Sequence, residues 1–306
     1  MPSPIRAPWI VACVLPLATS CSIRDLAANG LAGVMSSVET AYASDNDPEL
    51  VAAALPFGLK TIEALLIDSP DNEKLLLSAC RGYVQYSYAF VESEALYHEN
   101  TDYEYAQHLR DRALNLYLRA RDYGLRALEL RYPGVGEGLR NRPDATAEIL
   151  GEEDIPLMYW ISAAWGSAMS VGLDRPDIVA DVDAARALLR RALVLDEDYS
   201  GGALHEAMIV IEALPELMGG SPERAREHFA RAIELSGGDS AGAYVSLASS
   251  ISVGAQDREE FVRLMESALA IDVDSVPELR LANTISQKRA RYLLQEVDNL
   301  FLQPID

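Results

Sequence analysis

Apolar positions recur three and four residues apart along most of this chain after its first twenty residues. That spacing places apolar side chains on one face of an α-helix, whereas a strand would show alternation, and no sustained alternation occurs. The pattern therefore predicts an all-α protein built from successive amphipathic helices.

Short motifs mark where these helices begin and end. A capping oxygen, a proline and an acid occur together in Asp47-Pro48-Glu49, Ser69-Pro70-Asp71 and Ser221-Pro222-Glu223. The proline lacks only an N–H that the first helical turn does not use, and the acid suits the helix dipole, so each motif predicts a helix start. The predicted stops are Gly201-Gly202, Gly219-Gly220 and Gly237-Gly238. From Gly134 to about Pro156 we expect a loop of roughly twenty residues. Its glycines could suggest a phosphate cradle, but no strand precedes them and no Gly-Lys-Ser/Thr follows, so a plain loop between repeats is favoured.

One pattern repeats along the chain. Close copies are Arg126-Ala127-Leu128-Glu129-Leu130, Arg191-Ala192-Leu193-Val194-Leu195 and Arg231-Ala232-Ile233-Glu234-Leu235, with weaker copies at Ser267–Ile271 and Glu63–Ile67. The alanines Ala192, Ala232 and Ala268 stand 40 and 36 residues apart, which fits a degenerate helix pair of the tetratricopeptide type. These repeats predict an α-solenoid over residues 21–306, a single helical-repeat domain in which each helix pair buries its apolar face on the next.

The first twenty residues have the features of an export signal. Arg6 precedes an apolar run, Trp9–Ala18, which is too short to cross a bilayer of about 30 Å as a helix. The run leads to Thr19-Ser20-Cys21, which resembles a bacterial lipobox, although Ala18 stands where that pattern prefers Leu. We expect cleavage after residue 20 and lipidation of Cys21; the alternative is a leader cleaved elsewhere. Ser22, in place of Asp, favours sorting to the outer membrane from the periplasmic side.

Composition narrows the classes of function. Acidic residues outnumber basic ones 47 to 26, a net charge of −21 that disfavours nucleic-acid binding and attachment to anionic lipid through basic residues. We therefore expect membrane contact through the lipid anchor only. After lipidation of Cys21 only Cys80 remains, on an apolar helical face, as a buried thiol.

No standard catalytic or metal motif occurs, and paired carboxylates are common in so acidic a chain. We expect no enzyme activity, no cofactor and no metal site. An unrecognised hydrolase using carboxylates stays as a remote alternative.

Binding has better support from the aromatic residues, which cluster on three segments. Tyr and Trp combine an apolar ring with a polar tip, as ligand clefts and partner interfaces require, although such rings also pack between helices. The residues expected to line a cavity are Tyr83, Tyr86, Phe90, Tyr159, Trp160, Trp165, His205 and Asn283.

Several segments together resemble the TatT component of TRAP transporters. The similarity is carried by Gly82-Tyr83-x2-Tyr86-x3-Phe90, Leu157-x-Tyr159-Trp160-x3-Ala164-Trp165, Tyr199-x-Gly201-Gly202-Ala203-x-His205, Leu214-Pro215-x3-Gly219-Gly220-x-Pro222-Glu223 and Leu281-Ala282-Asn283. Their order and the lipobox together carry the resemblance, which spans roughly residues 21–302.

The resemblance implies a membrane-tethered periplasmic protein. Its implied partners are a periplasmic solute-binding protein and the membrane subunits of the transporter, and its implied ligand is a hydrophobic small molecule in a central cavity. A homo-oligomer is also compatible with this interpretation. The alternative is a helical-repeat scaffold for envelope proteins that has no small-molecule site.

Overall fold

The computed structural model describes residues 40–302, and every regular element in that range is helical. The all-α prediction is therefore confirmed. The leader, residues 1–20, and the predicted anchor residues Cys21 and Ser22 lie outside the described residues.

The N-terminal half contains one very long helix among shorter ones. Its elements are α2 (Pro48–Asp68), α3 (Glu73–Tyr86), the π-helical segment η1 (Ser87–Glu92), α4 (Ser93–His98), α5 (Tyr103–Arg131), α6 (Val135–Asn141), α7 (Pro143–Ala147), η2 (Glu152–Asp154) and α8 (Ile155–Val171). By length and composition alone α2 could cross a membrane. In the fold it packs against α3, where Leu59 of α2 reaches Gly82.

The C-terminal half consists of shorter helices joined by tight turns. Its elements are α9 (Pro176–Val179), α10 (Val182–Leu195), η3 (Tyr199–Gly201), α11 (Ala203–Glu212), η4 (Glu216–Met218), α12 (Pro222–Leu235), α13 (Ala241–Leu247), η5 (Ala248–Ser252), α14 (Arg258–Ala270), η6 (Pro277–Leu279), α15 (Arg280–Gln295) and α16 (Val297–Leu300).

Two of the three predicted helix starts are confirmed. Asp47 caps α2 by accepting the backbone N–H groups of Glu49 and Leu50, and Ser221 caps α12. The start predicted at Ser69 is wrong. A turn closed by the Asn72 N–H on the Ser69 carbonyl leaves Asn72 in extended conformation, so that Asn72 caps α3 instead.

The glycine pairs act at helix ends, though not all as stops. Gly237 and Gly238 have positive φ and close the end of α12, where the Gly238 N–H donates to the Ile233 carbonyl. Gly202 instead precedes α11 as its N-cap. A Cβ at Gly202 would lie 3.2 Å from the Ala232 backbone, so glycine there also permits close approach to α12.

The loop predicted between Gly134 and Pro156 is wrong in part, because α6 and α7 lie within it. Gly134 takes a positive φ of 84° at the N-cap of α6. The Glu129 carboxylate accepts the N–H groups of Gly134 and Gly136, which supplies the capping acceptor that glycine lacks.

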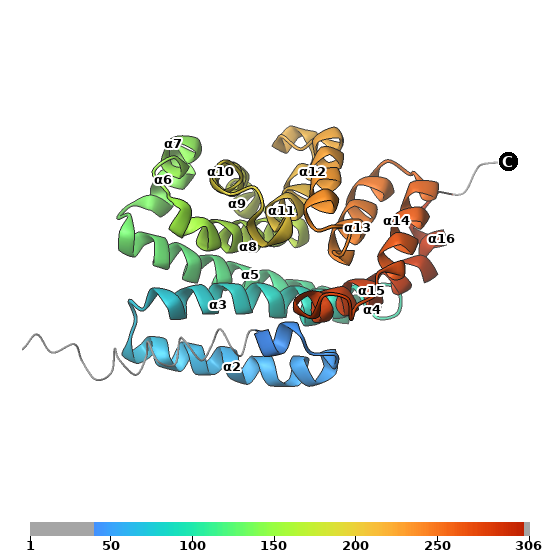
Figure 1. The fold of residues 1–306 in the computed structure, drawn as a ribbon, viewed down its shortest axis with the longest axis horizontal. Helices are drawn as coiled ribbons and strands as arrows, with labels where there is room; N and C mark the ends of the chain where they lie inside the picture. Colours follow the sequence, from blue (N-terminus) through green and yellow to red (C-terminus); the bar gives the residue numbers. More distant parts are fainter. Residues whose placement is uncertain (1–39, 303–306) are drawn as a thin grey trace, which may run out of the picture.

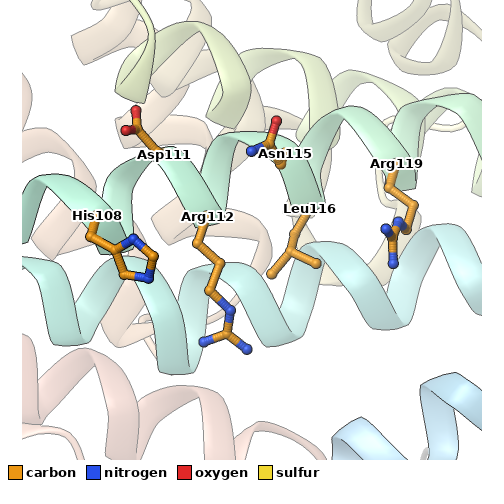
Figure 2. A pocket seen from close by; sticks show the side chains of 6 residues that line it. All are labelled: His108, Asp111, Arg112, Asn115, Leu116 and Arg119. Carbon is orange, nitrogen blue, oxygen red and sulfur yellow. The ribbon is translucent and has the colours of Figure 1, made fainter.

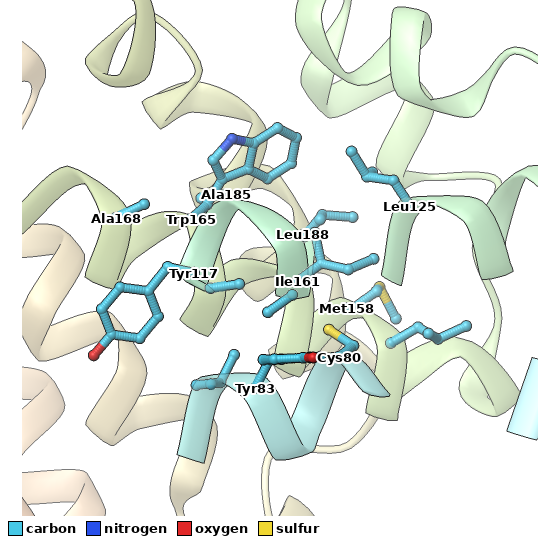
Figure 3. Close-up of a cluster of buried hydrophobic side chains, with 14 of the residues drawn as sticks. Cys80, Tyr83, Tyr117, Leu125, Met158, Ile161, Trp165, Ala168, Ala185 and Leu188 are labelled. Atoms are coloured by element: carbon cyan, nitrogen blue, oxygen red, sulfur yellow. The ribbon is translucent and has the colours of Figure 1, made fainter. Parts of the chain in front are cut away.

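The helices stack in chain order, α2 on α3, α3 on α5 and α5 on α8, and the array continues through α10 to α14 (Figure 1). Trp165 and Tyr117 are fully buried at the centre of the larger core, together with Ile161 and Cys80 (Figure 3). At Gly124 the helices α3, α5 and α8 meet: a Cβ there would lie 3.0 Å from Cys80 Sγ and 2.4 Å from Ile161 Cγ1. The missing side chain lets these helices approach closely.

The repeated pattern falls at the C-terminal ends of α2, α5, α10, α12 and α14. The alanines Ala127, Ala192, Ala232 and Ala268 are at most 2% exposed, whereas Ala64 of α2 is exposed. Small residues at these positions allow neighbouring helices to pack closely.

The last long helix returns to the beginning of the array, and Figure 1 shows α15 beside α4. Arg289 of α15 donates to Ser93 Oγ over 2.9 Å, and its guanidinium lies 4.6 Å from the centre of the Tyr88 ring. The rings of Tyr97 and Tyr292 meet edge to face at 5.1 Å. The two ends of the array therefore contact each other.

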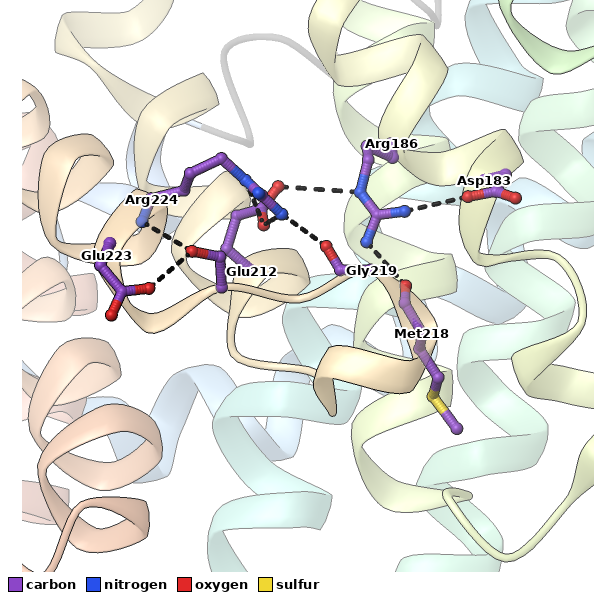
Figure 4. Close-up of polar contacts among 8 residues, drawn as sticks. Asp183, Arg186, Glu212, Met218, Gly219, Glu223 and Arg224 are labelled. Carbon is purple, nitrogen blue, oxygen red and sulfur yellow. Dashed lines mark hydrogen bonds and ion pairs between the residues drawn. The ribbon is translucent and has the colours of Figure 1, made fainter.

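A buried ion cluster joins α10, α11 and α12 (Figure 4). The carboxylate of Glu212, 1% exposed, accepts the Arg224 Nε–H over 2.9 Å and lies 3.7 Å from Arg186 Nε. Arg186 also donates to the Met218 carbonyl, and Arg224 to that of Gly219. The cluster fixes the η4 turn between α11 and α12.

Candidate functional site

The aromatic residues predicted from the sequence divide between two faces of α3. Tyr83 points towards α2 and α5, where its hydroxyl donates to Glu63 Oε1 over 2.7 Å and its ring stacks on that of Tyr123 at 6.1 Å. The Glu63 carboxylate also accepts from the Tyr123 hydroxyl at 3.0 Å. The hydrogen bonds from Lys60, Tyr83 and Tyr123 outweigh burial and lower the pKa of Glu63.

Tyr86 and Phe90 continue this face towards the N-terminal part of α5. Their rings lie 6.0 Å apart, and the Tyr86 hydroxyl accepts a hydrogen bond from Arg112 over 3.1 Å. Both rings are partly exposed.

Along α5 three arginines, Arg112, Arg119 and Arg126, stand seven residues apart, each over a tyrosine ring. The centroid distances are 5.7 Å to Tyr86, 5.4 Å to Tyr83 and 5.7 Å to Tyr123. We call these three the arginine row. Sequence reasoning missed it, although the seven-residue spacing of the arginines was a readable signal.

Two shallow hollows lie along the arginine row, with volumes of about 410 Å³ and 350 Å³. Figure 2 shows the first, between side chains of α5 alone. The first hollow is lined by His108, Asp111, Arg112, Asn115, Leu116 and Arg119, and the second by Asn115, Leu118, Arg119, Asp122, Tyr123 and Arg126.

Tyr159 and Trp160 of α8 form a second group, away from the arginine row. Their rings meet edge to face at 4.7 Å, Tyr199 lies 5.8 Å from Tyr159, and the Arg81 guanidinium lies 5.5 Å from the Trp160 ring. Burial, followed by the nearby carboxylate of Glu206, raises the pKa of Tyr159.

Glu206 links this group to the contact between the two ends of the array. Its carboxylate accepts from Ser240 Oγ over 2.9 Å, and burial raises its pKa. The same carboxylate contributes to the raised pKa of Tyr88, whose ring lies under Arg289. Aromatic rings and charged groups of α3, η1, α8, α11 and α15 therefore lie near one another. We call Arg81, Tyr88, Tyr159, Trp160, Glu206 and Arg289 the inner cluster.

Three other predicted residues lie apart from both groups. Trp165 is fully buried in the core, with the Arg121 guanidinium 5.8 Å from its ring. The side chain of Asn283 accepts from the Ala241 N–H and donates to the Asp239 carbonyl, so it holds the N-terminus of α13. His205 Nδ1 faces His228 Nδ1 at 2.8 Å, and its Nε2 lies 3.1 Å from Glu197.

The arrangement of these side chains suits binding better than catalysis. Cys80 is fully buried and desolvation raises its pKa, so the thiol is held protonated. Among residues 40–302 no group of three metal-binding side chains comes together. Stacked arginines and tyrosines, by contrast, present donors and flat apolar surface to a binding partner.

Comparison with known proteins gives two matches. The model of the family described as TRAP transporter T-component matches residues 44–301. A protein of Treponema pallidum (strain Nichols), described only as an uncharacterized protein, is 32% identical over 269 residues, which cover 85% of this chain and 82% of that protein.

Proposed function

Because the chain belongs to the TRAP transporter T-component family, it has an accessory role in a TRAP system, and we propose that it performs this role by binding the solute-binding protein of that system in the periplasm. The family match over residues 44–301 carries this proposal. The family is a class of transporter components and not of enzymes.

The test is a pull-down with purified proteins. The mature chain, with Cys21→Ser to keep it soluble, should retain the TRAP-type solute-binding protein encoded beside it, and should not retain an unrelated periplasmic binding protein. The proposal would be contradicted if the chain retained neither protein at about 100 µM, a concentration high enough to detect weak binding.

The arginine row is the surface best suited to such a partner. Guanidinium groups stacked on tyrosine rings are ordered before binding, so they lose less conformational entropy when they meet carboxylates. Arg112→Glu should weaken retention of the solute-binding protein, whereas Arg142→Glu, at an exposed position far along the chain, should not. Equal effects would place the contact elsewhere.

Attachment to the membrane through Cys21 is the second part of the proposal. It rests on the lipobox and on acyl chains contributing about 0.8 kcal/mol per buried CH₂. Cys21→Ser should move the protein to the soluble fraction, and Cys13→Ser, a matched change within the leader, should leave it on the membrane. Ser22→Asp should shift it from the outer to the inner membrane. An unmodified Cys21 in the mass spectrum of the mature protein would exclude this anchor.

A hydrophobic ligand is the third part of the proposal, and the inner cluster supports it. Tyr159 and Trp160 offer partly exposed apolar rings beside the Glu206 carboxylate. Native mass spectrometry should detect a co-purified lipid-like molecule that Trp160→Ala or Tyr159→Ala releases and that Tyr105→Ala, at an exposed ring on α5, retains. If all forms are free of ligand but still bind the solute-binding protein, the chain is a scaffold without a small-molecule site.

A further inference from the structure

The helix α2 has an exposed apolar face. Leu50, Phe57 and Ile67 are 59%, 79% and 82% exposed, and the exposed alanines Ala53 and Ala64 lie between them. Their spacing of three to seven residues places them on one side of the helix. Lys60, whose side chain is 69% exposed, lies on the same side, so the surface contains one charged group. An exposed apolar surface of this kind marks a contact that the described residues do not fill.

The internal repeat indicates what belongs on this face. The helices α5, α10, α12 and α14 carry the other copies of the repeat, and each packs against a helix that precedes it in the chain: α3, α8, α11 and α13. Their repeat alanines are buried, whereas the equivalent Ala64 is exposed. Within residues 40–302, no long helix precedes α2.

The sequence before α2 has the pattern that such a partner needs. Apolar side chains recur three and four residues apart at Ile23, Leu26, Ala27, Leu31, Val34, Val38 and Tyr42. Asp25, Asn29, Ser36 and Glu39 fall on the opposite side of a helical projection. This segment is amphipathic, and its apolar side requires a surface to cover it.

The described chain already enters alongside α2. The Tyr42 hydroxyl lies 3.8 Å from the point where a Cβ on Gly58 would stand, near the middle of α2. Gly58 lies roughly 100° around the helix axis from Phe57, so this contact is at the flank of the exposed face. A helix over residues 23–42 would be roughly 29 Å long, against roughly 30 Å for the 21 residues of α2. The segment is therefore long enough to follow α2 back to its C-terminal end.

We propose that residues 23–39 pair antiparallel with the exposed apolar face of α2 as the first helix of the array. Phe57 and Leu50 then become buried, and Ala64 takes the same role as the buried repeat alanines. The pairing also directs the N-terminus of the segment towards the α2–α3 turn at Asp68. If Cys21 is lipidated, as the proposed function holds, that turn faces the membrane.

Hydrogen exchange read by mass spectrometry tests the pairing without the lipid. The mature chain with Cys21→Ser should show amides of residues 26–38 exchanging at least 100-fold more slowly than in the unfolded chain. Phe57→Asp on α2 and Val34→Asp in the segment should each abolish that protection. Ser36→Asp, on the polar side of the segment, should retain it.

Four outcomes would overturn the pairing. Residues 26–38 could exchange at the unfolded rate, or keep their protection in both Phe57→Asp and Val34→Asp. Protection could also require vesicles of phosphatidylethanolamine and phosphatidylglycerol, which would make the lipid surface the occupant. Lastly, the protection of residues 26–38 could rise with protein concentration while ultracentrifugation detects a dimer. That result would make a second copy of the chain the occupant. None of these results depends on binding of the solute-binding protein, so the pull-down can fail or succeed independently.

Discussion

His205 and His228 face each other across the contact between α11 and α12, with their Nδ1 atoms 2.8 Å apart. One ring must donate and the other accept. Since His205 Nε2 lies 3.1 Å from the Glu197 carboxylate, its proton belongs on Nε2, and His228 Nδ1–H is then the donor to His205 Nδ1. Protonation of both rings would place two donors against each other.

This pair predicts a loss of stability on acidification. Burial and the neighbouring His205 lower the pKa of His228 to about 4, and burial lowers that of His205. Between an unfolded pKa near 6.5 and these folded values the unfolded chain binds more protons, so the free energy of unfolding falls as the pH drops from about 6.5 towards 4. After allowance for partial exposure we expect a loss of about 1 kcal/mol between pH 7 and pH 5.

Denaturant unfolding at the two pH values measures this loss. His228→Gln, which retains a donor, should flatten the dependence, and His108→Gln, at an exposed position of α5, should leave it unchanged. An identical slope in the wild type and His228→Gln would show that the histidine pair is not the cause.

The buried ion cluster predicts a strong effect of a single carboxylate. Glu212→Ala leaves Arg186, whose side chain is 7% exposed, without its nearest buried anion, and removal of one partner from a buried pair costs about 3–5 kcal/mol. We expect a loss near the lower figure, because Arg186 keeps Asp183 and the Met218 carbonyl. Denaturant unfolding would measure it. Glu216→Ala, on the exposed side of the same turn, should stay within about 0.5 kcal/mol, and equal losses in both variants would contradict the assignment.

Gly124 predicts a reversal of the usual preference of helices for alanine. A Cβ would lie 2.4 Å from Ile161 Cγ1, so Gly124→Ala should destabilise the fold by about 1–3 kcal/mol. Gly254→Ala, where nothing lies within 4 Å, should cost nothing or stabilise by up to about 1 kcal/mol. A double-mutant cycle with Ile161→Ala should recover part of the loss, and strict additivity would indicate that the two residues do not clash.

The sequence predicts a helix start correctly where a single capping residue determines it. Asp47 and Ser221 cap helices because a side-chain oxygen two or three residues from a free N–H is sufficient. Ser69 failed because the choice between two capping residues depends on the turn formed with Asn72, which no propensity resolves. The glycines near residue 134 suggest a loop from sequence alone, because their capping acceptor, Glu129, belongs to the preceding helix.

The candidate site was harder to predict because residue type does not tell which face of a helix is free. Residue type alone groups Tyr83 with Tyr159, yet one packs on Glu63 and the other beside Glu206. Asn283 has the same chemistry as a ligand-binding amide, but its partners are backbone groups 42 and 44 residues away. Only tertiary structure supplies such partners.

The contact between the two ends of the array predicts a local effect of Arg289. Arg289→Leu removes the donor to Ser93 Oγ and the cation over Tyr88, while Glu92 keeps the hydrogen bond from the Tyr117 hydroxyl. Because these contacts join α15 to η1 and α4, amide protection in α15 should fall at least 10-fold, and that in α8 and α10 should not change. Arg291→Leu, exposed on the same helix, should leave protection of α15 intact. If protection falls equally in α8, Arg289 stabilises the whole fold and not the contact between its ends.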